Sequence, residues 1–246
     1  MDAVLYVSHG SRKKEATEQA LDFLSKVQEE IGIPLFERCF LELAEPDIEE
    51  GIHRLVKKGA TRIAVLPVLL LSAGHYFEDI PEELDKAKLR FPGVELHYGE
   101  PLGVQERIID VLVDRVRDIV AGNQTPNILL VGRGSRHPST RTAMEFIGER
   151  LRSKAGADSV HVCYLAAITP SYDEAFHAVL ESGKPTVVVP YLWFTGVLLR
   201  SMEAKVQKAA EQGYAVKISG HLNDHPHMIE AMADRVKETL VGMKTP

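Results

Sequence analysis

Short apolar segments alternate along this chain with segments whose apolar residues recur at helical spacing. Apolar runs, which are typical of buried strands, fill or nearly fill the segments 3–7, 62–66, 128–131 and 186–189. Residues 14–31 instead carry Phe23, Val27 and Ile31 four residues apart, which predicts an amphipathic helix. Continuously apolar strands that alternate with amphipathic helices indicate a parallel sheet covered on both faces. The predicted fold class is therefore α/β, with doubly wound parallel sheets.

The same pattern occurs twice. Residues 5–12 (LYVSHGSR) align with 129–136 (LLVGRGSR), and the same offset of 124 aligns Cys39 with Cys163 and Pro46 with Pro170. Each copy is predicted to hold four strands, the last at 95–98 or 215–218, and to end in a helix. We expect an N-terminal domain at 1–122 and a similar C-terminal domain at 126–246, facing a central cleft. The join at 121–126 has turn chemistry.

Composition narrows the class of protein. The 246 residues suffice for two domains of common size, and the formal net charge of -6 argues against nucleic-acid binding. No apolar run approaches the roughly 20 residues of a membrane helix, and the N-terminus lacks the pattern of a signal peptide. The two cysteines lie far apart in sequence, as expected of free thiols in a reducing compartment. We therefore expect a cytoplasmic protein that binds neither nucleic acid nor membrane.

Three residues with metal-binding side chains follow the first three strands. His9 comes after the first strand, Glu42 after the second strand, predicted at 35–40, and His75 after the third. Ligands bind at the carboxyl ends of parallel strands, where such exit loops converge. Two histidines and a glutamate with open positions suit a borderline divalent metal such as ferrous iron, cobalt or nickel. His9 and His75 are the predicted metal ligands, and all three residues are the predicted catalytic set.

The second copy lacks this set. Arg133 stands in place of His9, Ala166 in place of Glu42 and Val197 in place of His75. The joint loss indicates that only the first copy performs metal chemistry, and the arginines suggest that the second copy holds the substrate. The predicted substrate-binding residues are Ser11, Arg12, Arg133, Ser135, Arg136 and Arg200, with His137 and Arg141 nearby.

A metal role is less strongly indicated for the histidines near the C-terminus. His221, His225 and His227 form a cluster that can in principle bind metal, but its His-Pro-His segment is typical of a helix entry. We place this cluster outside the site. The chain has neither a P-loop nor a complete Gly-x-Gly-x-x-Gly motif, so no organic cofactor is expected.

At these residues the chain resembles the class II chelatases, and among them the bacterial sirohydrochlorin ferrochelatases. The similarity covers essentially the whole chain, and the segments that carry it are 5–12, 40–42 (FLE), 66–75 (LPVLLLSAGH), 79–81 (DIP), 131–135 (VGRGS) and 189–196 (VPYLWFTG). It implies that His9 and His75 bind the metal, with Glu42 at the same site. The implied reaction inserts ferrous iron into sirohydrochlorin, forms sirohaem and releases two protons.

Other functions remain open. The family implied by the resemblance also contains cobaltochelatases, although the absence of a histidine-rich stretch and of a C-terminal cysteine cluster favours iron. A non-catalytic carrier of tetrapyrrole or metal would use the same residues. A phosphate-binding enzyme would use Ser11, Arg12 and the following helix N-terminus, but this hypothesis leaves His75 unexplained. Because the duplication already supplies two domains, we expect a monomer.

Overall fold

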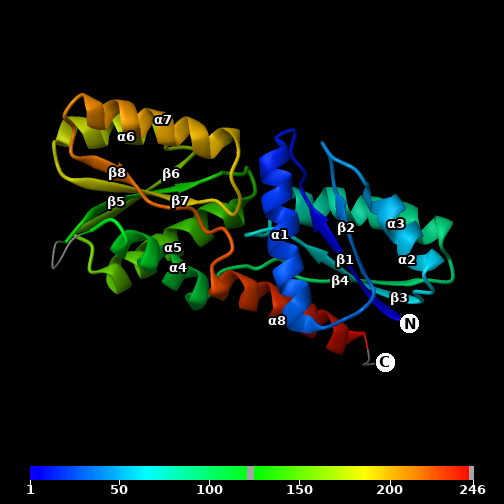
Figure 1. Cartoon of the computed structure of the whole chain (residues 1–246). Coiled ribbons are helices and arrows are strands. Elements are labelled where there is room, and N and C mark those ends of the chain that lie inside the picture. Colours follow the sequence, from blue (N-terminus) through cyan, green and yellow to red (C-terminus); the bar gives the residue numbers. More distant parts are fainter. Residues whose placement is uncertain (121–124, 244–246) are drawn as a thin grey trace. The chain divides into compact units, whose positions relative to one another are not determined.

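The computed structural model describes residues 1–120 and 125–243 (Figure 1). The first half contains β1 (Asp2–Ser8), α1 (Lys14–Ile31), β2 (Phe36–Phe40), α2 (Ile48–Lys57), β3 (Arg62–Pro67), the π-helical turn η1 (His75–Asp79), α3 (Ile80–Arg90), β4 (Glu95–Tyr98) and α4 (Glu106–Arg117). The second half contains β5 (Asn127–Gly132), α5 (Pro138–Ala155), β6 (Ser159–Tyr164), α6 (Tyr172–Ser182), β7 (Thr186–Tyr191), α7 (Val197–Glu211), β8 (Val216–Ile218) and α8 (Pro226–Gly242).

The strands form two parallel sheets of the same topology. Their orders are β2-β1-β3-β4 and β6-β5-β7-β8, and every neighbouring pair is parallel. In the second sheet, α6 and α7 cover one face and α4 and α5 the other (Figure 1). The prediction of two similar, doubly wound α/β halves is confirmed.

The helices form because their apolar residues recur where they can face a sheet. In α1, Ala20, Phe23, Leu24 and Val27 are buried on one side, and the helix ends at Gly32, whose left-handed φ of 69° suits glycine. Such buried apolar faces hold the helices on the sheets, because the burial of apolar surface is the main favourable contribution to folding.

Two helices were missing from the sequence-based prediction. α3 and α7 each lie between the third and fourth strands of their copy. The apolar spacing that drives α3 is visible in the sequence, since Ile80, Leu84 and Ala87 are the buried residues of this helix. Pro81 lies in its first turn, where a proline costs no hydrogen bond. The Gly and Pro residues around 74–81 indicate a loop locally, and packing onto the sheet overrides that signal.

The compact units of the structure differ in extent from the sequence copies. One unit comprises residues 1–103 and the chain from Ile229 on, and the other comprises 104–228. Helix α4 thus belongs with the second sheet and most of α8 with the first. The repeat suggested a division at 1–122 and 126–246, whereas contacts assign the last helix of each copy to the other unit. Residues 121–124 of the predicted join lie outside the described residues.

Specific contacts hold these exchanged helices in their units. In the second unit, Glu106 of α4 lies 2.7 Å from Arg150 of α5. In the first unit, Arg235 of α8 donates to the Leu102 carbonyl at 3.0 Å. The side chain of Thr239 occupies the space beside Gly99, where a Cβ would lie 2.4 Å from its hydroxyl oxygen. A glycine therefore permits the close approach of α8 to the end of β4.

The loop after β1 is held against the loop after β2 by backbone hydrogen bonds. Leu41 N–H donates to the Ser8 carbonyl at 2.8 Å, and Glu42 N–H donates to the His9 carbonyl at 3.1 Å. Gly10 has a φ of +93°, and a Cβ there would lie 1.8 Å from the Glu42 carbonyl oxygen. Only glycine fits this turn, so Gly10 is a geometric requirement of the loop.

The second copy repeats this backbone arrangement in its hydrogen bonds. Leu165 N–H donates to the Gly132 carbonyl and Ala166 N–H to the Arg133 carbonyl, both at 3.0 Å. Gly134 has a φ of +87°, and a Cβ there would lie 2.0 Å from the Ala166 carbonyl oxygen. The duplication is therefore preserved in the backbone of the loop, while the side chains at its key positions differ.

Among the helices of residues 1–120 and 125–243, none has the length and apolarity that crossing a membrane requires.

The Gly10 turn generates a stability prediction. We expect Gly10→Ala to lower the free energy of unfolding by roughly 2–4 kcal/mol, because it adds a backbone clash to the strain of a positive φ. Gly32→Ala is the control, since Gly32 also has a positive φ but a Cβ added there would meet no atom within 4 Å; it should cost only about 1 kcal/mol. Urea unfolding monitored by circular dichroism gives both free energies. An equal loss of stability in the two variants would contradict the predicted clash at Gly10.

Candidate metal centre

The site lies where three neighbouring strands end. Ser8 at the end of β1 pairs with Phe40 of β2, and Val7 pairs with Pro67 of β3. One further hydrogen bond, from Val68 N–H to the Val7 carbonyl at 2.8 Å, continues the register beyond β3. The chain segments that leave these three strands therefore start from one edge of the sheet, as the parallel topology requires.

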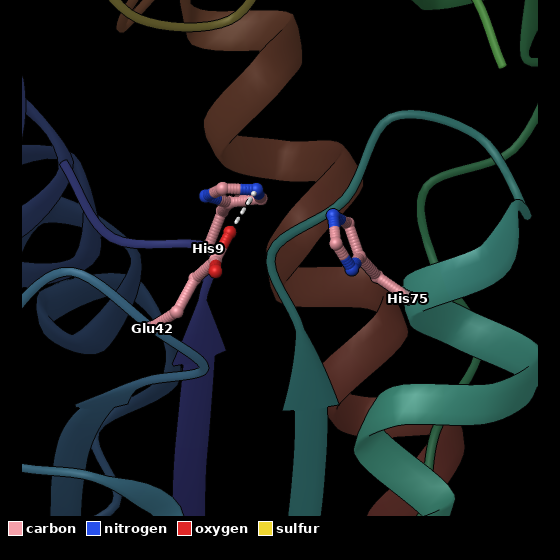
Figure 2. A group of neighbouring side chains, drawn as sticks. All are labelled: His9, Glu42 and His75. Carbon is pink, nitrogen blue, oxygen red and sulfur yellow. Dashed lines mark ion pairs between the residues drawn. The ribbon is translucent and has the colours of Figure 1, made fainter.

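His9, Glu42 and His75 come together at this edge (Figure 2). The Nε2 atom of His9 lies 3.1 Å from Oε1 of Glu42. The ring centroids of His9 and His75 are 4.7 Å apart, with an angle of 77° between the rings. One possible ligand atom from each residue lies within 4.8 Å of the other two. The structure thus places close together the three residues that the sequence separates by up to 66 positions.

These distances suit a single metal ion. With metal–ligand bonds of about 2.1 Å, ligand atoms of one ion lie roughly 3–4 Å apart, so small rotations would bring all three into coordination. Nitrogen and carboxylate ligands suit ferrous iron, cobalt or nickel. Relative exposures of 23% for the His9 side chain, 31% for His75 and 50% for Glu42 leave solvent access for a further ligand. Such a site can receive and release a metal.

The hydrogen bonds around the two histidines bear on which ring nitrogen is available to a metal, and they assign it for His75. Nδ1 of His9 lies 3.2 Å from the Gly10 carbonyl, and Nδ1 of His75 lies 2.5 Å from Oδ2 of Asp79. Because the Asp79 carboxylate can only accept, Nδ1 of His75 carries the proton and its Nε2 keeps the lone pair. His9 has an acceptor beside each ring nitrogen, since its Nε2 also lies 3.1 Å from the Glu42 carboxylate, so its partners do not select one tautomer. In the sequence, Asp79 stood out only as part of the DIP segment. Its spacing of four residues from His75 was the available signal.

Tyr76, the residue after His75, packs against Tyr98. Their rings stack at 5.0 Å, and the Tyr98 hydroxyl donates to the Tyr76 carbonyl at 3.1 Å. Burial, with a smaller contribution from its hydrogen bond to Glu100, raises the pKa of Tyr76 to about 12. Tyr76 therefore stays protonated at neutral pH and is unsuited to act as a base. These rings support the segment that carries His75.

Ser11 and Arg12 lie in the same loop as His9. The Ser11 hydroxyl accepts a hydrogen bond from Lys13 N–H at 3.1 Å, so its oxygen helps to shape the entry to α1. The Arg12 side chain is exposed. Both lie in the unit that contains the metal centre, as expected from the sequence.

The other predicted substrate residues belong to the second unit. Arg133, Arg136 and Arg200 are exposed, and Ser135 is half-buried. The Ser135 hydroxyl accepts from His137 N–H at 3.2 Å, which matches the bond that Ser11 accepts from Lys13 in the first copy. Within its own unit, Arg133 occupies the loop position that His9 occupies in the first.

The histidines near the C-terminus do not assemble a comparable set. Within residues 1–120 and 125–243, the only group of three or more potential ligands at metal-binding distances is His9, Glu42 and His75. Nε2 of His225 lies 3.6 Å from Asp114. Burial and the nearby Arg115 lower the pKa of His225, which favours a neutral ring packed in the second unit.

Comparison with known proteins assigns the fold to a family. The CbiX family model matches residues 3–119 and 127–239. A sirohydrochlorin ferrochelatase from Priestia megaterium is 42% identical over 99% of this chain and 92% of its own length.

Two solved structures also match nearly the whole chain. SirB from Bacillus subtilis with Fe3+ is 39% identical with a TM-score of 0.88, covering 99% of this chain and 97% of that one. The sirohydrochlorin chelatase SirB from Bacillus subtilis subspecies spizizenii in complex with cobalt is 38% identical with a TM-score of 0.85, covering 97% and 94%.

The ligand geometry predicts a single site for cobalt(II), a convenient probe that can be titrated without any tetrapyrrole. We expect His9→Ala and His75→Ala each to raise the Kd for cobalt(II) by roughly 100-fold or more, because each removes a ligand rather than an outer hydrogen bond. Isothermal titration calorimetry measures the change. His53→Ala is the matched control, because His53 also contacts a glutamate, Glu50 at 3.4 Å, without a third ligand. The proposed site would be wrong if the control lost as much affinity for cobalt(II), or if the two ligand variants lost none.

Proposed function

The chain belongs to the CbiX family, and from that premise we propose that it inserts ferrous iron into sirohydrochlorin to form sirohaem, with release of two protons. The observation that carries the proposal is the convergence of His9, Glu42 and His75 on one metal-sized space. The relative that is 42% identical bears the name of this activity, and a structure 39% identical is described with Fe3+. The name of this relative supports iron over the cobaltochelatase alternative, whereas the similar structures were obtained with Fe3+ and with cobalt.

In this mechanism His9 and His75 hold the ferrous ion through their Nε2 atoms. Two imidazoles and one carboxylate leave open positions, which pyrrole nitrogens of the substrate can enter one after another. Each new nitrogen ligand replaces a protein ligand or water, so the ion moves to the macrocycle without a change of oxidation state. The partial exposure of the three side chains allows the ring to approach.

Metal insertion requires an acceptor for the two pyrrole N–H protons. Glu42 is a suitable first acceptor, because its carboxylate lies at the site and 3.1 Å from His9 Nε2. Once the iron leaves, the His9 Nε2 lone pair is free to accept the second proton or to relay the first to water. Glu42 thus has two roles, as a weak metal ligand and as a base.

The second unit recognises the substrate in this proposal. Sirohydrochlorin carries many carboxylates, and arginine binds a carboxylate through paired, charge-assisted hydrogen bonds. Arg133, Arg136 and Arg200, with Ser135, are the proposed contacts of the second unit, and Ser11 and Arg12 are those of the first. Replacing the metal-binding histidine by Arg133 on the same loop backbone converts a cation site into an anion site.

The reaction needs no organic cofactor, because neither a redox step nor a group transfer occurs. We further propose that the protein acts as a monomer in the cytoplasm, without nucleic acid or membrane partners. The fused duplication provides both the metal half and the substrate half in one chain.

Turnover tests the function directly. Under anaerobic conditions, we expect the wild type to insert ferrous iron into sirohydrochlorin, and the change in absorbance measures the rate. In His9→Ala and His75→Ala the rate of insertion should fall more than roughly 100-fold. Glu42→Gln should lower kcat more than it weakens cobalt(II) binding, because it removes the base but keeps an oxygen ligand. A wild type that binds the ring and the metal without inserting iron would be a carrier. Faster insertion of cobalt than of iron would identify a cobaltochelatase.

The substrate half is tested separately. We expect Arg133→Ala to raise KM for sirohydrochlorin by roughly 10- to 150-fold, the effect of losing one charge-assisted carboxylate contact of about 1.5–3 kcal/mol. The Kd for cobalt(II) should not change. Arg152→Ala, which removes another exposed arginine of the same unit, is the control and should keep KM unaltered. An unchanged KM in Arg133→Ala would leave the metal site intact but contradict the division of roles between the units.

A further inference from the structure

His75 shares its π-helical turn with a carboxylate that the proposed mechanism does not use. Asp79 closes the turn that His75 opens, and its Oδ2 lies 2.5 Å from Nδ1 of His75. The two side chains lie on the same side of the helix because they are four residues apart. The Asp79 side chain is 50% exposed, so burial does not force this pairing.

We propose that Asp79 is a positioning residue that orients His75 and makes it the stronger of the two histidine ligands; this inference rests on the proposed role of His75 in binding the metal. Asp79 accepts a hydrogen bond from Nδ1–H of His75, which holds the ring in one tautomer and presents the Nε2 lone pair to the cluster. A carboxylate on the far nitrogen also increases the basicity of an imidazole ligand. The Nδ1 of His9 instead faces a neutral acceptor, the Gly10 carbonyl at 3.2 Å.

A purely structural role for Asp79 does not account for the geometry. Aspartate is a favoured N-cap residue, and Asp79 directly precedes α3. Its backbone is nevertheless right-handed helical, and its side chain makes no capping hydrogen bond. Asp47, by contrast, caps α2 by accepting from Glu50 N–H at 2.8 Å. The carboxylate of Asp79 is directed to His75 instead of to the helix.

The second copy supplies an independent comparison. Gly74 and Gly196 precede η1 and α7, so Val197 corresponds to His75 and Ser201 corresponds to Asp79. The ligand and the carboxylate are lost together. The structural cap persists, because Ser171 caps α6 at the position that corresponds to Asp47. Residues that maintain the fold keep a capping side chain in both copies, whereas Asp79 occurs only where the histidine does.

Hydrogen bonds to its backbone hold the turn that carries His75 and Asp79. The Tyr98 hydroxyl donates to the Tyr76 carbonyl at 3.1 Å, and Ile80 N–H donates to the His75 carbonyl to close the π turn. With its backbone held in this way, the remaining freedom of His75 is rotation of its ring. The hydrogen bond to Asp79 removes that freedom before a metal arrives.

The test uses three variants of the whole protein. Asp79→Ala removes both acceptor and charge, Asp79→Asn keeps an acceptor without the charge, and Glu78→Gln removes one charge from the neighbouring exposed residue. In metal-free protein, nitrogen-15 NMR of the histidine rings should report an Nδ1–H tautomer of His75 in the wild type and in Glu78→Gln. In Asp79→Ala it should report a mixture of tautomers.

Metal binding should follow the tautomer. We expect the Kd for cobalt(II) to rise roughly 10- to 100-fold in Asp79→Ala, less in Asp79→Asn, and not at all in Glu78→Gln. In turnover, KM for the metal should rise while KM for sirohydrochlorin stays the same. Thermal unfolding should show equal stability in all three variants, because the carboxylate caps no helix.

Two results would overturn the inference. One is an Nε2–H tautomer of His75 in the wild type, and the other is a cobalt(II) Kd in Asp79→Ala equal to that of Glu78→Gln. Both measurements are made without sirohydrochlorin, so they remain decisive if the chain proves not to insert iron. Conversely, if His75→Ala abolished iron insertion and Asp79→Ala changed neither insertion nor cobalt(II) binding, the proposed function would stand and only the positioning role of Asp79 would be wrong.

Discussion

The parallel register of β1 with β2 and β3 is the constraint on which the rest of the site depends. Pairing of Ser8 with Phe40 and of Val7 with Pro67 fixes the ends of three strands at one edge. The bond from Glu42 N–H to the His9 carbonyl then extends the pairing into the loops. A shift of this register by one residue would separate His9 from Glu42 and turn their side chains to opposite faces. The metal centre is therefore a consequence of backbone hydrogen bonding as much as of ligand chemistry.

The duplication separates what the backbone contributes from what the side chains contribute. Both copies keep the glycine with a positive φ, Gly10 or Gly134, and both make the same two hydrogen bonds beside it. The difference lies in His9 against Arg133 and in Glu42 against Ala166. One loop geometry can thus present either a metal ligand or a cation, because the backbone places the side chain without specifying its chemistry. Divergence after duplication then needs only a few substitutions.

Much of the site could be predicted from the sequence because its residues follow strands. His9, Glu42 and His75 each come shortly after a predicted strand, and parallel topology brings such positions together. The helix α3 was missed because Gly74 and Pro81 indicate a loop, although Ile80, Leu84 and Ala87 have helical spacing. Local residue preferences are weak where a sheet face selects the outcome. The exchange of the terminal helices could not be predicted for a different reason. An amphipathic pattern shows that a helix has a buried face but not which of the two sheets that face packs against. Helix α4 follows the first sheet in the chain and joins the unit of the second.

The proposed activity requires a site that binds metal and also gives it up, and the chemistry of the three ligands meets both needs. A closed set of four strong ligands, as in structural zinc sites, would compete with the nitrogens of the tetrapyrrole. Two imidazoles and a half-exposed carboxylate hold the ion less tightly and leave positions for the incoming ring. If Asp79 strengthens one imidazole, the ion keeps one firm attachment while its bonds to His9 and Glu42 are exchanged for pyrrole nitrogens. An asymmetric pair of histidines would then make the transfer of the ion stepwise. The bond to His9, which lies beside the proposed base Glu42, would break before the bond to His75.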